Sequence, residues 1–323
     1  MHAGDPVAEN PRPLIALSSC LNGEKVRFDG AHKRDNWLLE KLGEFVDYRT
    51  YCPEVAIGLG IPRPPIRLVE RNGDTRVLGV KDPTVDVTEQ LQNYAFDVLP
   101  KLVDVSGYVF KSKSPSCGMF RVKRYNDKGH PEGNAVGAFA EVIAQQMPDL
   151  PIEEEGRLND AVLRENFVNR VFVYQRLQQL HADGLRAASL IAFHSDHKYL
   201  VMAHSQAAYK RLGRMLSDLK SCDLDTLFAD YQHELMQALK RRVNRARHAN
   251  VLQHLQGYLK KHTDSGDKAE IGAAIEDYRR GEVPLVVPMR LLRHYFRRHP
   301  DDYIARQVYL EPAPAKLGLR NHV

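Results

Sequence analysis

The chain has 323 residues, long enough for two domains with a sizeable core, and its composition is that of an ordinary globular protein. Its beginning lacks the apolar core of a signal peptide, and no apolar run reaches the length of a membrane span. We therefore expect a cytoplasmic protein without a membrane partner. In that compartment four cysteines argue against structural disulfides and favour metal or redox chemistry.

The net charge of +5 is unevenly distributed along the chain. Residues 1–150 have a net charge of −1, whereas residues 151–323 carry 27 Lys and Arg against 21 Asp and Glu. This excess suggests an anionic partner for the second half, with nucleic acid as the first candidate. A solvated helical surface that is rich in arginine explains the same charge equally well.

Residues 1–13 predict a disordered lead, after which strands alternate with helices as far as residue 156. The predicted strands cover residues 14–19, 46–51, 107–110 and 148–155, and the predicted helices cover residues 31–45, 86–105 and 135–146. Between them we expect a Gly- and Pro-rich loop at residues 58–65 and a hairpin over residues 66–87 that turns at Asn72, Gly73 and Asp74. This alternation indicates an α/β, Rossmann-like domain over residues 14–156 with a largely parallel sheet.

From residue 157 to residue 323 the apolar residues recur with the period of helices. The predicted helices run from about residue 158 to 180 and over residues 197–216, 224–240, 244–261, 268–281 and 290–298. Residues 283–289 read as an extended segment. The second half is therefore predicted to be an all-α domain.

Three cysteines, Cys20, Cys52 and Cys117, each follow an apolar run that reads as a strand. Side chains that follow parallel strands meet at one edge of the sheet, so we expect these thiols to converge there. Lys111 and Lys113 would favour the thiolate form of Cys117. The spacing leaves three interpretations open: a metal or cluster site, a cysteine nucleophile with a helper, or three buried cysteines without chemistry. Cys222 is interpreted as an incidental thiol.

The residues around these cysteines carry a resemblance to a known family. The motifs SSCLNG (18–23), RFDG (27–30), CPE (52–54), GLGIPR (58–63) and KSPSCG (113–118) resemble those of the TudS thiouracil desulfidase domain. The helical half is similar to the domain fused to it in two-domain RudS proteins, through FVNRVF (167–172) and FHSDHKYL (193–200). The resemblance implies a 4Fe-4S cluster on Cys20, Cys52 and Cys117, with one open iron. It also implies removal of sulfur from thiouracil or, for the two-domain form, from 4-thiouridine in tRNA.

This resemblance suggests a hydrolytic, non-redox mechanism. The thiocarbonyl sulfur is expected to bind the open iron, water to attack the ring carbon, and sulfide to leave. Glu54 and Ser114 are the catalytic candidates, and their roles as base or orienting group stay open. Glu54 could instead be a helix-start carboxylate and Ser114 a turn residue.

Five further residues are candidates for contacts with the substrate: Asn22, Asp29, Arg63, Lys111 and Lys113. For Asp29 a turn is the alternative role, and Arg63 could contact a phosphate. The two lysines could hold a substrate phosphate or compensate the charge of the cluster.

Two basic segments in the second half are candidate RNA-binding surfaces. The first includes Arg241, Arg245 and Arg247, and we expect positions 241, 245 and 248 to share one helical face. The second consists of four arginines: Arg290, Arg293, Arg297 and Arg298. Exposed arginine on helices is common, so each segment alone could equally be a solvated surface.

The histidines His194, His197 and His204 suggest a metal site, but no carboxylate accompanies them at metal-binding spacing. A hydrogen-bonded structural cluster is the favoured interpretation, with a domain interface or an RNA contact as alternatives. Three functions follow from the sequence: a desulfidase of 4-thiouridine in tRNA, a desulfidase of free thiolated pyrimidines, or a non-catalytic RNA-binding or metal-sensing module. Neither a membrane nor DNA is expected as a partner.

Overall fold

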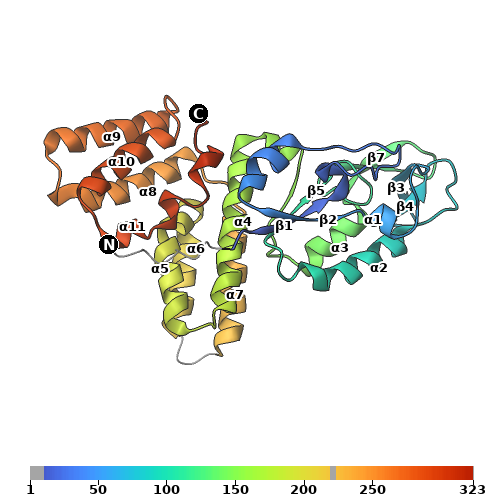
Figure 1. Ribbon diagram of the computed structural model, residues 1–323, viewed down its shortest axis with the longest axis horizontal. Coiled ribbons are helices and arrows are strands. Elements are labelled where there is room, and N and C mark those ends of the chain that lie inside the picture. The colour runs from blue at the N-terminus through green and yellow to red at the C-terminus, as the bar shows by residue number, and fades with distance from the viewer. Residues whose placement is uncertain (1–10, 219–222, 323) are drawn as a thin grey trace, which may run out of the picture. The chain divides into compact units, whose positions relative to one another are not determined.

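The computed structural model describes residues 11–218 and 223–322 (Figure 1). The chain divides into two compact units, the first ending at Gln146 and the second beginning at Met147. Most of the predicted disordered lead, and Cys222, lie outside the described residues.

Three strands of a parallel sheet, sheet A, form the centre of the first unit, and its fourth strand, β8 (Ile152–Glu154), comes after the division at Met147. Its strands are β1 (Leu14–Ser18), β2 (Asp47–Tyr51), β5 (Gly107–Phe110) and β8 (Ile152–Glu154), in the order β2-β1-β5-β8. Strand β1 pairs in parallel with both β2 and β5. Strand β5 is buried along its whole length, which is typical of a strand with both faces covered. The predicted parallel α/β fold is confirmed.

A second sheet, sheet B, lies in the same unit and was not predicted as a separate sheet. It contains β3 (Ile66–Arg71), β4 (Asp74–Gly79), β6 (Val122–Tyr125) and β7 (Pro131–Ala135), in the order β4-β3-β6-β7. Strands β3 and β4 form the predicted hairpin, and Asn72 and Gly73 adopt the positive φ angles of a tight hairpin turn. The hairpin ends at Gly79, earlier than predicted, and residue 80 begins a loop that leads to the next helix.

The helices of the first unit are α1 (Pro53–Ala56), α2 (Thr88–Val98) and α3 (Ala138–Gln146). Helix α2 stops before Pro100, which lacks the N–H that would continue it, and a 3-10 turn follows. The helix predicted over residues 31–45 is wrong, because only two short turns form, at Trp37–Lys41 and Leu42–Glu44. The preceding loop is tied instead to the turn after β1, where Lys33 N donates to the Cys20 carbonyl at 2.8 Å.

The second unit is helical, as predicted. Its helices are α4 (Ala161–Ala182), α5 (Ala187–His204), α6 (Gln206–Met215), α7 (Leu224–Leu239), α8 (Arg245–Tyr258), α9 (Ser265–Arg280), α10 (Val286–Arg298) and α11 (Asp302–Ala305). Polar side chains cap several of them; for example, Asp160 accepts the N–H groups of Val162 and Leu163 at the start of α4. None of the helices in the described part of the chain is both long and apolar enough to cross a membrane.

Two predictions for the second unit are wrong in their boundaries. The helix predicted over residues 197–216 is two helices, because Ser205 ends α5 and its side chain caps α6 by accepting Ala208 N. The segment predicted as extended at residues 283–289 already contains the first turn of α10. Pro288 lies in that first turn, where a missing N–H leaves no helical hydrogen bond unmade.

Candidate active site

The three cysteines lie at the carboxyl edge of sheet A. Cys20 is in the 3-10 turn Ser19–Asn22 directly after β1, Cys52 follows β2 and precedes α1, and Cys117 is in the loop after β5. All three line one pocket of about 370 Å³. The parallel register of β1, β2 and β5 is what brings together residues that are far apart in the sequence.

The loop that carries Cys117 is held by hydrogen bonds to the side chain of Ser114 and by close packing of the backbone at two glycines. Ser114 Oγ accepts the backbone N–H groups of Ser116 (3.2 Å) and Cys117 (3.1 Å). A Cβ atom on Gly118 would lie 2.4 Å from Val122 Cγ2, and one on Gly137 would lie 2.6 Å from the Ser116 carbonyl oxygen. Only glycine fits at these two positions, so the loop packs closely against the start of α3.

Burial, rather than the nearby lysines, dominates the ionisation of the thiols. Burial raises the pKa of Cys52 and raises the pKa of Cys117 well above its ordinary value, and the negative charge of Glu54 acts in the same direction on both. Lys111 Nζ donates to the carbonyl and hydroxyl oxygens of Ser112. Neither lysine is among the main causes of the pKa shift of Cys117, and their effect on its thiolate stays a prediction.

Three cysteine thiols around one pocket are a donor set that suits an iron–sulfur cluster. Within residues 11–218 and 223–322, no three Cys, His, Asp or Glu side chains lie close enough together to hold one ion. In a cluster each thiolate binds a different iron, so its ligands lie farther apart than those of a single ion. Iron would also supply the positive charge that buried thiolates need. The pocket volume falls within the range of roughly 300–1,000 Å³ that is usual for ligand sites.

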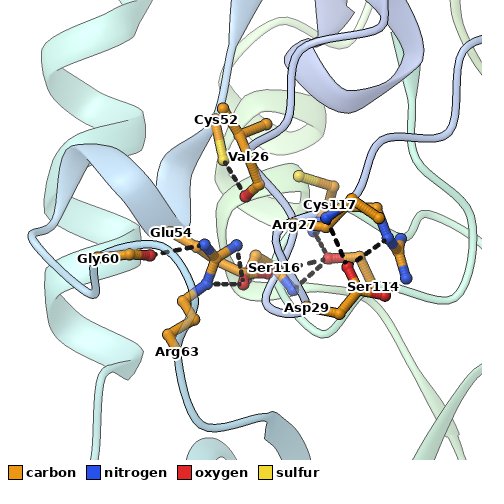
Figure 2. Close-up of polar contacts among 11 residues, drawn as sticks. Val26, Arg27, Asp29, Cys52, Glu54, Gly60, Arg63, Ser114, Ser116 and Cys117 are labelled. Carbon is orange, nitrogen blue, oxygen red and sulfur yellow. Dashed lines mark hydrogen bonds and ion pairs between the residues drawn. The ribbon is translucent and has the colours of Figure 1, made fainter.

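Glu54 lies beside the cysteines at the start of α1 and is held by four donors (Figure 2). Arg63 binds Oε2 through Nε (2.8 Å) and Nη2 (2.7 Å). Ser116 Oγ donates to Oε1 at 2.9 Å and Ser114 Oγ does so at 3.4 Å. The side chains of Arg63 and Glu54 are 4% and 14% exposed, so this is a buried ion pair with additional hydrogen bonds.

Two members of this network have roles that the sequence did not indicate. Ser116 is fully buried and binds Glu54 directly, yet a serine next to a cysteine carries no signal of such a contact. Arg63 was a candidate for a phosphate contact, but its Nε and Nη2 bind Glu54 and its Nη1 donates to the Gly60 carbonyl at 2.9 Å. It therefore positions Glu54 and does not present a free guanidinium to a substrate.

The other candidates for substrate contacts separate into two groups. Lys111 and Lys113 line the pocket, together with Arg27 and Lys33, which were not predicted. Asn22 is exposed and outside the pocket lining. The lining also excludes Asp29, which accepts Ala31 N at 3.1 Å and pairs with Arg27 at 3.5 Å, as a turn residue does. Neither residue lines the pocket, so a contact of either one with the substrate stays a prediction.

The histidines of the second unit form structural hydrogen bonds. His197 Nδ1 bonds the Phe193 carbonyl at 2.7 Å, and His204 Nδ1 bonds the Arg241 carbonyl at 2.5 Å. His194 bonds the Tyr231 hydroxyl at 3.1 Å and stacks on Tyr209. These hydrogen bonds agree with the favoured interpretation of a hydrogen-bonded structural cluster.

Their burial predicts a pH dependence of stability. Burial lowers the pKa of His197 to about 3 and that of His204 to about 4. The unfolded chain binds protons as the pH falls below about 6.5, whereas the folded chain does not, so stability is complete above that pH and is lost progressively towards pH 4. We expect the free energy of unfolding in urea to fall between pH 7 and pH 5 by about 1–2 kcal/mol per histidine. His204→Asn should reduce this fall and exposed His254→Asn should not; equal stability at both pH values would contradict the prediction.

The first basic segment differs from its predicted form. Arg241 precedes α8, whose N-cap is Asn244, so it is not on the same helix as Arg245. His248 is buried and bonds the Tyr309 hydroxyl at 2.8 Å. The predicted shared face of positions 241, 245 and 248 is therefore wrong. Arg241, Arg245 and Arg247 are nonetheless exposed.

Comparisons with known proteins find two families that match separate parts of the chain. Residues 15–155 match the sequence model of the family described as 2-thiouracil desulfurase, and residues 198–314 match the family described as a protein of unknown function, DUF1722. The uncharacterized protein YbgA of Escherichia coli (strain K12) is 35% identical over 153 residues, which are 47% of this chain and 90% of YbgA. The uncharacterized protein YbbK of Bacillus subtilis (strain 168) is 32% identical over 114 residues, which are 32% of this chain and 73% of YbbK.

A solved structure is also similar. It is that of TudS, a 4Fe-4S-dependent thiouracil desulfidase, which is 31% identical in sequence to this chain. The match covers 49% of this chain and 100% of the TudS chain, with a TM-score of 0.39. The family matches, the two relatives and the order of the cysteine motifs lead to one assignment. The chain belongs to the 2-thiouracil desulfurase family through its first unit, which is joined to a DUF1722 domain.

Proposed function

We propose that this chain is a 4Fe-4S-dependent desulfidase that converts 4-thiouridine in tRNA to uridine by hydrolytic C–S cleavage and releases sulfide. Cys20, Cys52 and Cys117 would hold the cluster. The observation that carries the proposal is the convergence of three cysteines on one pocket beside a carboxylate that four donors hold in place. Membership of the 2-thiouracil desulfurase family supports the reaction class.

The chemistry divides between the cofactor and the protein. When bound, a cluster with three thiolate ligands supplies one thiophilic iron without a protein ligand, which acts as a Lewis acid. Glu54 accepts the proton of the attacking water. Arg63 and Ser116 hold its carboxylate in one orientation for this step. The Ser114 hydroxyl, 3.4 Å from Glu54 Oε1, orients the pyrimidine or passes a proton to Glu54. No step changes the oxidation state of the substrate, so no nicotinamide or flavin is needed.

The lining of the pocket favours a nucleotide over a free base. Lys33, Lys111 and Lys113 contribute three positive charges. Arg27 is paired with Asp29, and the lining carboxylate of Glu54 is paired with Arg63. A thiolated pyrimidine has no charge that requires these groups, but the phosphates of a polynucleotide do. The charge of the second unit and the exposed Arg241, Arg245 and Arg247 support tRNA as the bearer of the thionucleoside.

The test uses cluster-reconstituted full-length protein under anaerobic conditions. Two substrates are compared, tRNA containing 4-thiouridine and free thiouracil, and both loss of the thio compound and release of sulfide are measured. Replacing Arg241, Arg245 and Arg247 with glutamate should slow turnover of tRNA and spare that of the free base. The control variant replaces Arg186, Lys210 and Arg214, which are exposed elsewhere, with glutamate and has the same net charge.

The outcomes separate the candidate functions. The proposal is supported if the unchanged protein turns over tRNA and the control variant retains that turnover. Turnover of free thiouracil alone would select the second candidate, which the description of the family favours. Failure on both substrates with an intact cluster would leave a non-catalytic RNA-binding or metal-sensing role. Equal loss of both activities in the triple variant would remove these arginines from the RNA-binding surface.

A further inference from the structure

A cavity of about 190 Å³ lies within the helical unit, away from the cysteines. One wall is α10, with Met289, Arg290 and Arg293, and the opposite wall is the segment of residues 310–321 near the end of the chain. Much of the remaining lining is apolar, including Leu319. The cavity therefore combines a hydrophobic surface with guanidinium groups, which is the composition of a site for an organic anion.

Arg320 and Asn169 line this cavity and also line a smaller one of about 30 Å³. Arg320 Nε donates to Glu165 at 2.9 Å and its Nη1 donates to the Tyr309 carbonyl at 2.7 Å. Its Nη2 is buried and has no hydrogen-bond partner among the described residues. Asn169, which lines the same cavity and is 5% exposed, has an Oδ1 atom without a partner among those residues. Buried polar atoms rarely stay unpaired, so a ligand or water is expected to supply one donor and one acceptor here.

The mouth of the cavity carries an excess of positive charge. Arg293 donates to the Leu310 carbonyl and lies 3.6 Å from Glu311. Burial lowers the pKa of Arg293, and the positive charges of Arg320 and Arg290 act in the same direction. Arg290 is exposed, and its side chain makes no hydrogen bond or ion pair within residues 11–218 and 223–322. The guanidinium of Arg290 is thus available to bind an anion, and Arg293 lines the same cavity.

We propose that this cavity binds one unpaired nucleotide of an RNA strand, with the phosphate on Arg290 and Arg293 and the base against the apolar wall. The volume is below the usual lower limit of about 300 Å³ for a complete small ligand, so the cavity suits one unit of a longer chain. Base edges carry a donor beside an acceptor, the two groups that Asn169 and Arg320 lack. Unpaired RNA bases bind in this way to apolar and arginine surfaces, and arginine forks match phosphate.

The proposal rests on RNA as the substrate under the proposed function, but its test does not need desulfidation. The binding of two fluorescent RNA hairpins to the full-length chain is measured by anisotropy, one blunt-ended and one with an unpaired overhang. Arg290→Gln removes the free guanidinium, and Ala315→Trp places a bulky group from an exposed position into the mouth of the cavity. Arg214→Gln, an exposed arginine on α6 that lies outside the lining and outside both basic segments, is the matched control.

We expect the unpaired overhang to increase the affinity for RNA about tenfold. Both cavity variants should remove this increase, and the control variant should change it less than about twofold. Cytidine monophosphate should compete with the overhang, and inorganic phosphate should compete much less. Equal losses in Arg214→Gln, equal binding of both hairpins, or equally effective inorganic phosphate would each overturn the proposal. Because the RNAs contain no thionucleoside and no cluster is required, failure here would leave the desulfidase proposal intact, and the reverse also holds.

Discussion

Cys52→Ala is expected to give a folded chain that neither retains a cluster nor removes sulfur from a thiolated pyrimidine. Changes to groups that only support metal ligands already reduce activity by about 10–100-fold, so loss of a ligand should reduce it by at least about 100-fold. Folding should survive, because Cys52 is only partly buried and its Sγ makes a weak 3.9 Å contact with the Val26 carbonyl. The measurements are iron and sulfide content after anaerobic reconstitution, the visible absorption spectrum, and turnover.

Cys222→Ala is the matched control for this experiment, because it removes a thiol that lies outside the three cysteine-containing motifs, SSCLNG, CPE and KSPSCG. It should keep about four irons per chain and full activity, like the unchanged protein. Iron content in Cys52→Ala equal to that of the unchanged protein would show that the three-cysteine assignment is wrong, whatever the activity.

Glu54→Gln is expected to lower turnover by about 10²–10⁴-fold while leaving the cluster bound, because the amide cannot accept a proton from water. It should also destabilise the fold. The Arg63 side chain is 4% exposed and would lose its charge partner, and breaking such a buried pair costs about 3–5 kcal/mol. Stability is measured by urea unfolding, and turnover is measured in single-turnover assays on both substrates.

A double variant separates the catalytic role of Glu54 from its structural one. Glu54→Gln combined with Arg63→Met removes both charges, so most of the lost stability should return. Activity should stay low if Glu54 handles a proton in the reaction. Recovery of activity together with stability would instead mean that Glu54 serves only to neutralise Arg63.

The strand-end position of the cysteines could be recognised without the structure, because it depends on local signals. Apolar runs of strand length precede each cysteine, and the chirality and parallel pairing of α/β folds direct such positions to one edge. Asn72-Gly73 likewise predicted its turn, since few other residue pairs adopt two successive positive φ angles. These features require knowledge of only a few neighbouring residues.

The contacts of the site required the tertiary structure. Arg63 and Ser116 bind Glu54 from positions 9 and 62 residues away in the sequence, and no local pattern encodes those distances. The helix predicted over residues 31–45 failed for the same reason, since long-range hydrogen bonds to the Cys20 turn compete with helical ones. Asn22 and Asp29 have suitable chemistry but lie outside the pocket lining.

The sequence by itself determined the α/β and all-α halves, the strand-end cysteines and the likeness to thiouracil desulfidases. These depend on periodicity, on turn residues and on motif order, all of which are properties of short segments. Only the tertiary structure decided which polar groups meet. Burial and pairing made Arg63 a partner of Glu54, placed His248 in the core, and gathered Arg290, Arg293 and Arg320 around one cavity. Such contacts depend on how distant segments pack, and packing is a property of the whole chain.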